Sequence, residues 1–267
     1  MFDYGDYWAS TESAYALVAS LMLRVASNPQ MMQTEKQLPS LLSISDGVGI
    51  ISIEGSLIPG NAGWMTYFGV TGYNDVSEAA VAAANNGDVK SVLLDVNSGG
   101  GAVNGCSECA EILVQLGSVK PMVTYSGGVM ASAAYWLGAQ GQAVLTGATS
   151  ILGSIGVIAK HTEMSKMRAD LGYKDTVIRS GIYKQLANDV EPLSALAVQE
   201  IQAKVDQIAL VFDQNISAAR GVSLAKFQAE MGQGREFVGA QAVKSGLADG
   251  LSSYSGAIAA AKAMQSR

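Results

Sequence analysis

The sequence predicts an α/β fold in which helices cover both faces of a mostly parallel sheet. From residue 48 onward, short apolar runs alternate with stretches of helical spacing, which is the pattern of successive βαβ units. Runs this apolar are typical of strands that are buried on both faces. Hydrophobic residues make up 49% of the chain and charged residues only 15%, below the usual share of about 25%. Part of the surface is therefore expected to be buried between subunits.

The N-terminal segment is predicted to be an arm attached to this domain. Residues 10–27 have apolar residues at helical spacing and end before Pro29, which indicates a helix, and a Gln- and Met-rich linker follows to about Asp46. We therefore expect two parts: an N-terminal helical arm and linker at residues 1–46, and one domain at residues 47–267.

The elements of the domain follow from the alternating pattern. The predicted strands are residues 48–53, 91–96, 122–125, 143–146, 157–159 and 175–178. The predicted helices between them are residues 74–86, 103–116, 132–140 and 162–171. Beyond Glu191 we expect a long helix to about Arg220, two shorter helices, and an alanine-rich tail helix from Ser255.

Charge and cysteine content argue against two kinds of partner. The net charge is −6, and no run of Lys and Arg could neutralise a phosphate backbone, so nucleic acid is not expected to bind. Cys106 and Cys109 have no second pair or nearby His to complete a metal set. We expect them to be two small helix residues in a reducing compartment.

The chain shows no segment that predicts membrane insertion. The apolar stretch at residues 14–25 follows Asp3, Asp6 and Glu12, where a signal peptide needs positive charge. The stretch is too short to span a bilayer, and no run of about 18 apolar residues occurs elsewhere. We expect a cytoplasmic protein without a membrane span.

Two glycine-containing segments follow predicted strands, where ligands collect in open α/β sheets. The first, residues 97–102, has the sequence Asn-Ser-Gly-Gly-Gly-Ala. Its glycines could aim backbone N–H groups at an oxyanion, but a tight strand-to-helix turn also needs glycine. The second follows Tyr125 and leads through two glycines to Ser132. Ser132 is either a nucleophile at a helix start, or an N-cap or small packing residue.

A serine nucleophile needs a base, and the residues alone leave that base open. The only histidine is His161, and no GxSxG motif is present, so a Ser-His-Asp triad would have to use His161. A lysine can replace histidine if burial favours its neutral amine. Lys184 follows an apolar strand and a glycine turn, and Lys160 is a rival, although most lysines are simply solvated.

Six segments carry a resemblance through their order and spacing. They are residues 71–74 (TGYN), 97–101 (NSGGG), 130–133 (MASA), 153–157 (GSIGV), 180–184 (SGIYK) and 242–249 (AVKSGLAD). Together they resemble the signal-peptide-peptidase A family of serine proteases, and within it the branch of lambda-type phage capsid-assembly proteases. The similarity covers about residues 48–252.

The resemblance implies a fold and a set of site residues. The fold is a crotonase-like or ClpP-like stack of βαβ units. Ser132 is the implied nucleophile, Lys184 its general base, and Ser154 the residue that orients this lysine by a hydrogen bond. The backbone N–H groups of Gly101 and Ala133 are the implied oxyanion hole. The chemistry needs no metal and no cofactor.

The implied function is that of a serine endopeptidase of a phage or prophage. It would cleave capsid or scaffold proteins during capsid maturation, in the host cytoplasm or inside the procapsid. We expect the substrate peptide to bind as an extended strand, and the enzyme to be a ring-shaped homo-oligomer whose neighbouring subunits can share a site. Two alternatives are a catalytically idle assembly protein and a crotonase-like acyl-CoA enzyme, which would have no use for Ser132 with Lys184.

Three features depart from the family pattern. Gly99 stands where many members have proline, which leaves the oxyanion turn less rigid. The lack of a membrane anchor argues against a bacterial signal-peptide peptidase and for the phage branch. Lambda-type proteases continue into a scaffold segment beyond the point that corresponds to Arg267, so we expect scaffolding to come from another chain or from the leading arm.

Overall fold

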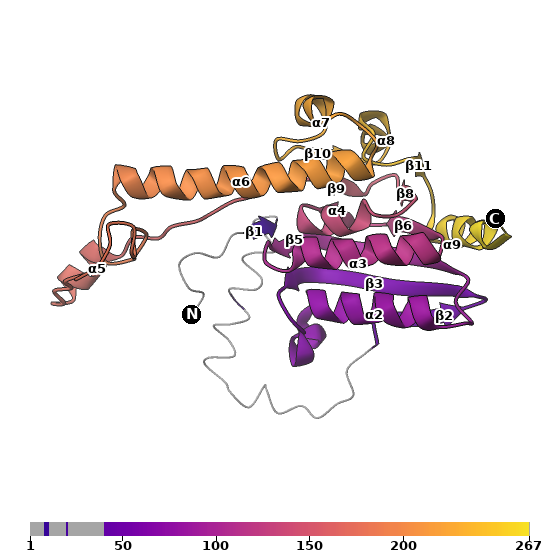
Figure 1. Ribbon diagram of the computed structural model, residues 1–267, viewed down its shortest axis with the longest axis horizontal. Coiled ribbons are helices and arrows are strands. Elements are labelled where there is room, and N and C mark those ends of the chain that lie inside the picture. Colours follow the sequence, from indigo (N-terminus) through magenta and orange to yellow (C-terminus); the bar gives the residue numbers. More distant parts are fainter. Residues whose placement is uncertain (1–7, 11–19, 21–39, 267) are drawn as a thin grey trace.

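The computed structural model describes residues 8–10, 20 and 40–266, and it has the predicted α/β architecture (Figure 1). Its strands are β1 (Trp8–Ser10), β2 (Leu42–Ser45), β3 (Val48–Ile58), β4 (Val70–Gly72), β5 (Ser91–Ala102), β6 (Met122–Ser126), β7 (Val129–Ala131), β8 (Ala143–Thr146), β9 (Ile151–Gly153), β10 (Glu236–Val238) and β11 (Gly250–Leu251). Its helices are α2 (Tyr73–Asn85), α3 (Cys106–Val119), α4 (Ala133–Gly138), α5 (Ser165–Asp170), α6 (Ala195–Ala219), α7 (Leu224–Glu230), α8 (Ala240–Ser245) and α9 (Tyr254–Ala263), with short 3-10 helices η2 (Gly63–Phe68) and η3 (Met264–Ser266).

Most of the predicted arm lies outside the described residues. The helix expected at residues 10–27 falls there apart from Ser10, which belongs to β1, and Ser20. At the end of the expected linker, β2 pairs with β3 and so joins the sheet. The division of the chain at residue 46 stays a prediction.

The strands form one curled sheet that is centred on β5. Along one edge β5 pairs with β3, and along the other it pairs first with β6 and then, at Ser98, with β7. The strand order is β10-β9-β7-β5-β6-β8-β11, and β3 connects β2 and β4 to this path. The N-terminal half of β5 therefore pairs with β6, and its C-terminal half pairs with β7, which in turn pairs with β9.

Helices cover both faces of this sheet, as the apolar strands predict. On one face, Leu94 packs in the main core with residues of α2, α3 and α4. On the other face, Leu93 and Val123 pack with Ala257 and Ala261 of α9. Successive residues of β5 thus point into different cores, because side chains alternate along a strand.

β5 is longer than predicted, and the glycines expected in a turn lie within it. Its pairing with β3 continues as far as Leu57 opposite Gly101. A Cβ atom on Gly101 would lie 1.9 Å from the carbonyl oxygen of Leu57, so only glycine permits this close approach. The predicted turn directly after Val96 is wrong, and α3 begins at Cys106 rather than at residue 103.

Two predicted strands are also wrong. Residues 157–159 contribute only an isolated bridge at Ile158, and residues 175–178 form no strand. The first lies where the chain leaves the body toward α5 and the second follows α5 (Figure 1). Ile178 is 92% exposed. β-branched residues favour a strand when neighbouring strands offer a packed surface, and none of the described strands pairs with residues 175–178. The strand of this region is instead the shorter β9.

The C-terminal helices follow the prediction, and α6 joins the body to an extension. The rings of Trp136 on α4 and Phe212 on α6 stack with their centroids 4.4 Å apart, which anchors the C-terminal half of α6. The N-terminal half runs outward to α5 (Figure 1). We call residues 156–194 the extension. Among residues 8–10, 20 and 40–266, no helix combines the length and apolar character needed to cross a membrane.

Candidate active site

Ser132 lies on a sharp turn between a strand and a helix. It follows the last residue of β7 and directly precedes α4, with φ 54° and ψ −124°. This backbone conformation is essentially restricted to glycine, and a serine held in it stores roughly 1–3 kcal/mol of strain. Such strain persists only where the surroundings fix the residue, and it concentrates at functional sites.

The hydroxyl of Ser132 has no structural partner among the described residues. The side chain is 1% exposed, and its Oγ atom makes no hydrogen bond, a state shared with Ser126 Oγ and Trp136 Nε1. Ser132 occupies the N-cap position of α4, but its side chain does not accept a hydrogen bond from the helix. A buried hydroxyl without a partner costs about 1–3 kcal/mol. Ser132 therefore stands at the N-cap position without capping the helix through its side chain.

The backbone holds Ser132 beside Ser154. β7 and β9 run parallel with Ala131 opposite Gly153. Ser132 and Ser154 directly follow these two residues, so they lie side by side where the strands end. The N–H of Ser132 donates to the carbonyl oxygen of Gly153 at 2.7 Å, and the N–H of Ser154 donates to the carbonyl of Arg235 at 2.7 Å. Ser154 also has a positive φ, of 50°. The structure thus brings together two of the predicted site residues.

The two predicted oxyanion donors come from neighbouring strand ends. Ala133 is the first residue of α4, so its N–H has no acceptor within the helix. Gly101 lies near the end of β5, just beyond Ser98, which pairs with Met130 of β7. Because β5 and β7 are neighbours, both peptide groups lie at the same end of the sheet. Their role as an oxyanion hole stays a prediction.

Two side chains that sequence reasoning did not assign brace this part of the sheet. The buried hydroxyl of Tyr73 donates to the carbonyl oxygen of Ala102 at 2.6 Å, and burial raises its pKa well above the usual value, so it stays a neutral donor. Asn97 accepts a hydrogen bond from the N–H of Val129 at 3.1 Å and so links β5 to β7. Tyr73 and Asn97 both lie in segments that carry the family resemblance. That resemblance is the sequence feature from which their importance could have been inferred.

Lys184 does not lie beside Ser132 within one chain. It is exposed on the extension, and its neighbour Tyr183 lines a cavity with Ala197 near the start of α6. The body end of α6, by contrast, is anchored at Phe212. Ala197 and Phe212 are separated by roughly 22 Å along the helix, at about 1.5 Å per residue. The predicted nucleophile and base therefore lie on different parts of the chain.

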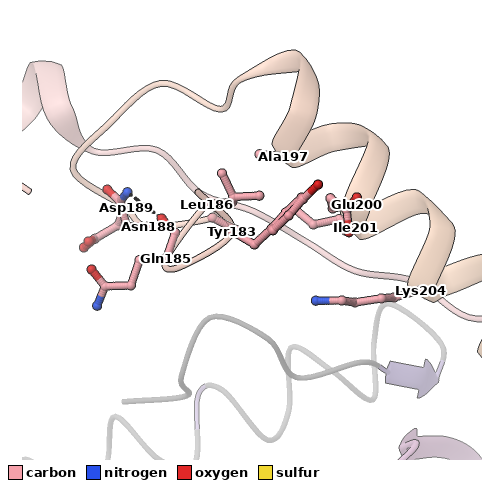
Figure 2. Close-up of a pocket in the computed structure, with 10 residues that line it drawn as sticks. Tyr183, Gln185, Leu186, Asn188, Asp189, Ala197, Glu200, Ile201 and Lys204 are labelled. Atoms are coloured by element: carbon pink, nitrogen blue, oxygen red, sulfur yellow. Dashed lines mark hydrogen bonds between the residues drawn. The ribbon is translucent and has the colours of Figure 1, made fainter. Parts of the chain in front are cut away.

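The cavity near Lys184 belongs to the extension and not to the serine site. It lies between residues 183–189 and α6 and has a volume of about 310 Å³. Figure 2 shows Tyr183 and Leu186 directed toward the helix, with Glu200, Ile201 and Lys204 on the helix side. Lys184 does not line this cavity, so the cavity does not bury its amine.

The two rivals to Lys184 lie where the extension leaves the body. Lys160 is exposed there. The Nε2 atom of His161 lies 2.9 Å from the carbonyl oxygen of Asn188, so its ring joins the outgoing and returning halves of the extension. Since Ser132 Oγ has no hydrogen-bond partner among the described residues, neither side chain forms a catalytic pair with it in this structure.

The cysteines lie on a helix, α3, as predicted, and both are buried there. Burial raises the pKa of Cys109 to about 11, and it also raises the pKa of Cys106. Both therefore remain neutral thiols at physiological pH. The thiol of Cys106 lies 3.7 Å from the carbonyl oxygen of Ala133, where it packs α3 against the start of α4.

A mostly parallel α/β sheet with a buried serine on a strained strand-to-helix turn is the arrangement of a serine hydrolase. Comparison with known families agrees, because the sequence pattern of Peptidase family S49 matches residues 115–266. The matched part is more than half of the chain and includes Ser132, Ser154 and Lys184. The chain belongs to peptidase family S49, which confirms the resemblance inferred from the six segments.

The similar curated proteins include phage and bacterial members. The head-tail preconnector protein GP5 of Enterobacteria phage P21 is 28% identical over 234 residues, covering 88% of this chain and 46% of the relative. The capsid assembly protease C of Escherichia phage lambda is 28% identical, covering 80% and 48%. A putative signal peptide peptidase SppA of Enterococcus faecium is 30% identical, covering 60% and 47%. The chain spans about half the length of these relatives.

Proposed function

We propose that this chain is a serine endopeptidase that uses Ser132 as nucleophile and Lys184 as general base. The observation that carries the proposal is the state of the Ser132 hydroxyl, which is buried, unpartnered among the described residues and held on a strained turn. Backbone strain and a buried hydroxyl without a partner both lower the stability of the fold, and a purely structural residue would need neither. Membership of a peptidase family supports hydrolysis of peptide bonds.

The proposed reaction is acyl transfer. Neutral Lys184 accepts the proton of Ser132 as the Oγ atom attacks the carbonyl carbon of the substrate peptide. The N–H groups of Gly101 and Ala133 stabilise the negative oxygen that forms. The protonated lysine then donates to the leaving amine, and water releases the acyl group from the serine. Ser154 orients the lysine amine from its position beside Ser132.

The base is proposed to come from a neighbouring subunit. Within one chain Lys184 lies on the extension, which projects from the body (Figure 1). The extension exposes Ile178, Ile182 and Tyr183, which are 92%, 66% and 60% exposed. Apolar side chains exposed together typically mark a protein interface. A ring in which each extension reaches the next subunit would bury these side chains and deliver Lys184 to the next Ser132.

The proposed substrates are capsid or scaffold proteins of a phage or prophage, processed in the host cytoplasm or within the assembling capsid. The support is that two relatives are a capsid assembly protease and a head-tail preconnector protein. In this proposal the substrate binds as an extended strand, and no cofactor takes part.

The test is intact-mass analysis after incubation with a small fluorophosphonate, which reacts covalently with activated serines. Wild type is expected to gain a single adduct, and Ser132→Ala and Lys184→Ala are expected to gain none. Lys160→Ala is the matched control and should label like wild type. If assembled wild type takes up no adduct, the alternative of a catalytically idle assembly protein is favoured.

A further inference from the structure

The edge of β5 that faces Ser132 is open to another extended chain. Gly100 and Gly101 pair with β3 along one edge. Along the other edge, β7 pairs at Ser98 and then turns away into α4 at Ser132. Within residues 40–266, no strand pairs with this edge beyond that point. The backbone groups there form the kind of edge to which a peptide adds as a strand.

A segment of the N-terminal arm occupies this edge. β1 runs antiparallel to β5, with Trp8 opposite Ala102, Ala9 opposite Gly101 and Ser10 opposite Gly100. Because β3 already holds the first edge, β1 must lie on the second, from which β7 departs (Figure 1). An extended piece of this chain therefore lies alongside Gly101, the proposed oxyanion donor.

The placement of β1 is that of a peptide bound by strand addition. In this mode, backbone hydrogen bonds to a sheet edge hold an extended chain in a fixed register. β1 is three residues long, and among the described strands it pairs only with β5. In the sequence, residues 11–39 separate it from the domain. In this same state Ser132 is 1% exposed, so little of it is accessible to a substrate.

We infer that β1 is a pseudo-substrate strand that occupies the peptide-binding edge of β5 and competes with substrate for it. This inference rests on the proposed function of Ser132. Substrate can bind only in molecules whose β1 is displaced, so the apparent affinity for substrate is the intrinsic affinity multiplied by the fraction of molecules with a free edge. If β1 is in place in about nine of ten molecules, freeing the edge raises kcat/KM about tenfold.

The first test removes backbone donors from β1 by the double substitution Ala9→Pro with Ser10→Pro. Successive N–H groups of a strand point to opposite edges, so one of the two prolines removes a donor that faces β5. The matched control is Ala9→Val with Ser10→Thr, which keeps both donors and favours a strand. A second variant begins at Thr11 and lacks β1 altogether. The probe is fluorescein-labelled casein, an unstructured protein.

The expected result is a kcat/KM about tenfold higher for the proline variant and for the shortened chain, at unchanged kcat, with the control near wild type. Equal kcat/KM in all four proteins, with the fold and assembly intact, would overturn the inference. A change in kcat alone would also overturn it, since competition acts on KM.

A binding measurement separates this inference from the proposed function. A fluorescein-labelled peptide of residues 6–12 is added to Ser132→Ala proteins with and without the two prolines, and its fluorescence anisotropy is followed. The peptide should bind the proline protein at least several-fold more tightly, because the edge is free there. Equal binding, or none, counts against β1 as a pseudo-substrate. Failure of wild type to cleave casein or to react with fluorophosphonate would refute only the protease function.

Discussion

The N–H of Ser132 donates a 2.7 Å hydrogen bond to the carbonyl oxygen of Gly153. This bond joins the end of β7 to the end of β9, where Ser132 and Ser154 both have a positive φ. Because the backbone fixes the turn, the position of the Ser132 hydroxyl is set before any substrate arrives. Preorganisation of this kind is a large part of what a catalytic site contributes.

Ser132→Ala is expected to leave stability unchanged or to raise it by about 1 kcal/mol, because it removes a buried hydroxyl that has no partner. Ser150→Ala is the matched control, since the buried Ser150 hydroxyl donates to the carbonyl of Ser126 at 2.9 Å and its loss should cost about 1 kcal/mol. Urea unfolding at fixed protein concentration measures both. A clear loss of stability in Ser132→Ala would show that the hydroxyl has a structural role.

Gly101→Ala is expected to destabilise the fold by about 3 kcal/mol and to abolish fluorophosphonate labelling. The new methyl group would meet the carbonyl oxygen of Leu57 at 1.9 Å, so β3 and β5 would have to separate beside the proposed oxyanion donor. In Gly87→Ala the methyl group enters open space, and stability should change by less than about 0.5 kcal/mol. Equal stability of the two variants, measured by urea unfolding, would contradict the close pairing of β3 with β5.

The sequence predicted the layers of the fold better than it predicted the ends of strands. Apolar runs identified the buried strands, because a strand covered on both faces has few polar positions. The same reasoning ended one strand at Val96, since glycines are typical of turns. In the structure β5 continues to Ala102 because glycine allows the close approach to Leu57. Local propensity could not show this, as the contact joins residues distant in sequence.

Asp249→Asn is expected to lower stability at neutral pH by about 2 kcal/mol. Arg220, whose side chain is only 8% exposed, donates to Asp249 at 2.6 Å and would lose its charged partner. Loss of one partner of a fully buried pair costs about 3–5 kcal/mol, and the cost is smaller here because the Asp249 side chain is 44% exposed. Urea unfolding at pH 7 measures the difference.

The same variant has a predicted pH dependence. Burial alone would raise the pKa of Asp249, but hydrogen bonds from Arg220 and from the Val144 amide outweigh it and hold the pKa below its usual value. A carboxyl whose folded pKa is lowered stabilises the fold above its unfolded pKa, about 3.9, and loses this contribution as the pH falls through the folded value. The difference between wild type and variant should therefore shrink below about pH 4. Asp170→Asn, which breaks an exposed pair with Lys166, should have little effect at any pH.

The rate of Ser132 acylation by fluorophosphonate is expected to rise with pH. A lysine accepts the serine proton only in its neutral form, and the neutral fraction increases as protons are removed. His161→Ala should follow the same pH profile as wild type, because His161 contacts Asn188 within the extension. The rates are measured by quenching the labelling reaction at set times at each pH and recording the adduct by mass spectrometry. A rate that does not change with pH, or a profile that is lost in His161→Ala, would contradict a lysine base.

The candidate site was predictable only in part from the sequence. The resemblance placed Ser132 and Ser154 in one site, and the structure brings these residues together through the pairing of β7 with β9. It also named Lys184, which in one chain lies on the extension. Which subunit supplies a residue depends on packing between copies, and the sequence of a single chain carries no direct record of it. The occupation of the β5 edge by β1 was missed because the arm was interpreted as a helix from Ser10 onward.

The most direct test of a site shared between subunits is to mix two inactive variants, Ser132→Ala and Lys184→Ala, in equal amounts under conditions that allow subunits to exchange. In a closed ring each site would take its serine from one subunit and its lysine from the next. Random mixing should then restore casein cleavage to about a quarter of the wild-type rate, and the adduct should appear only on the Lys184→Ala chains. If the mixed assemblies stay inactive although mass spectrometry of the intact complexes shows that subunits have exchanged, the lysine of one subunit does not serve the serine of another.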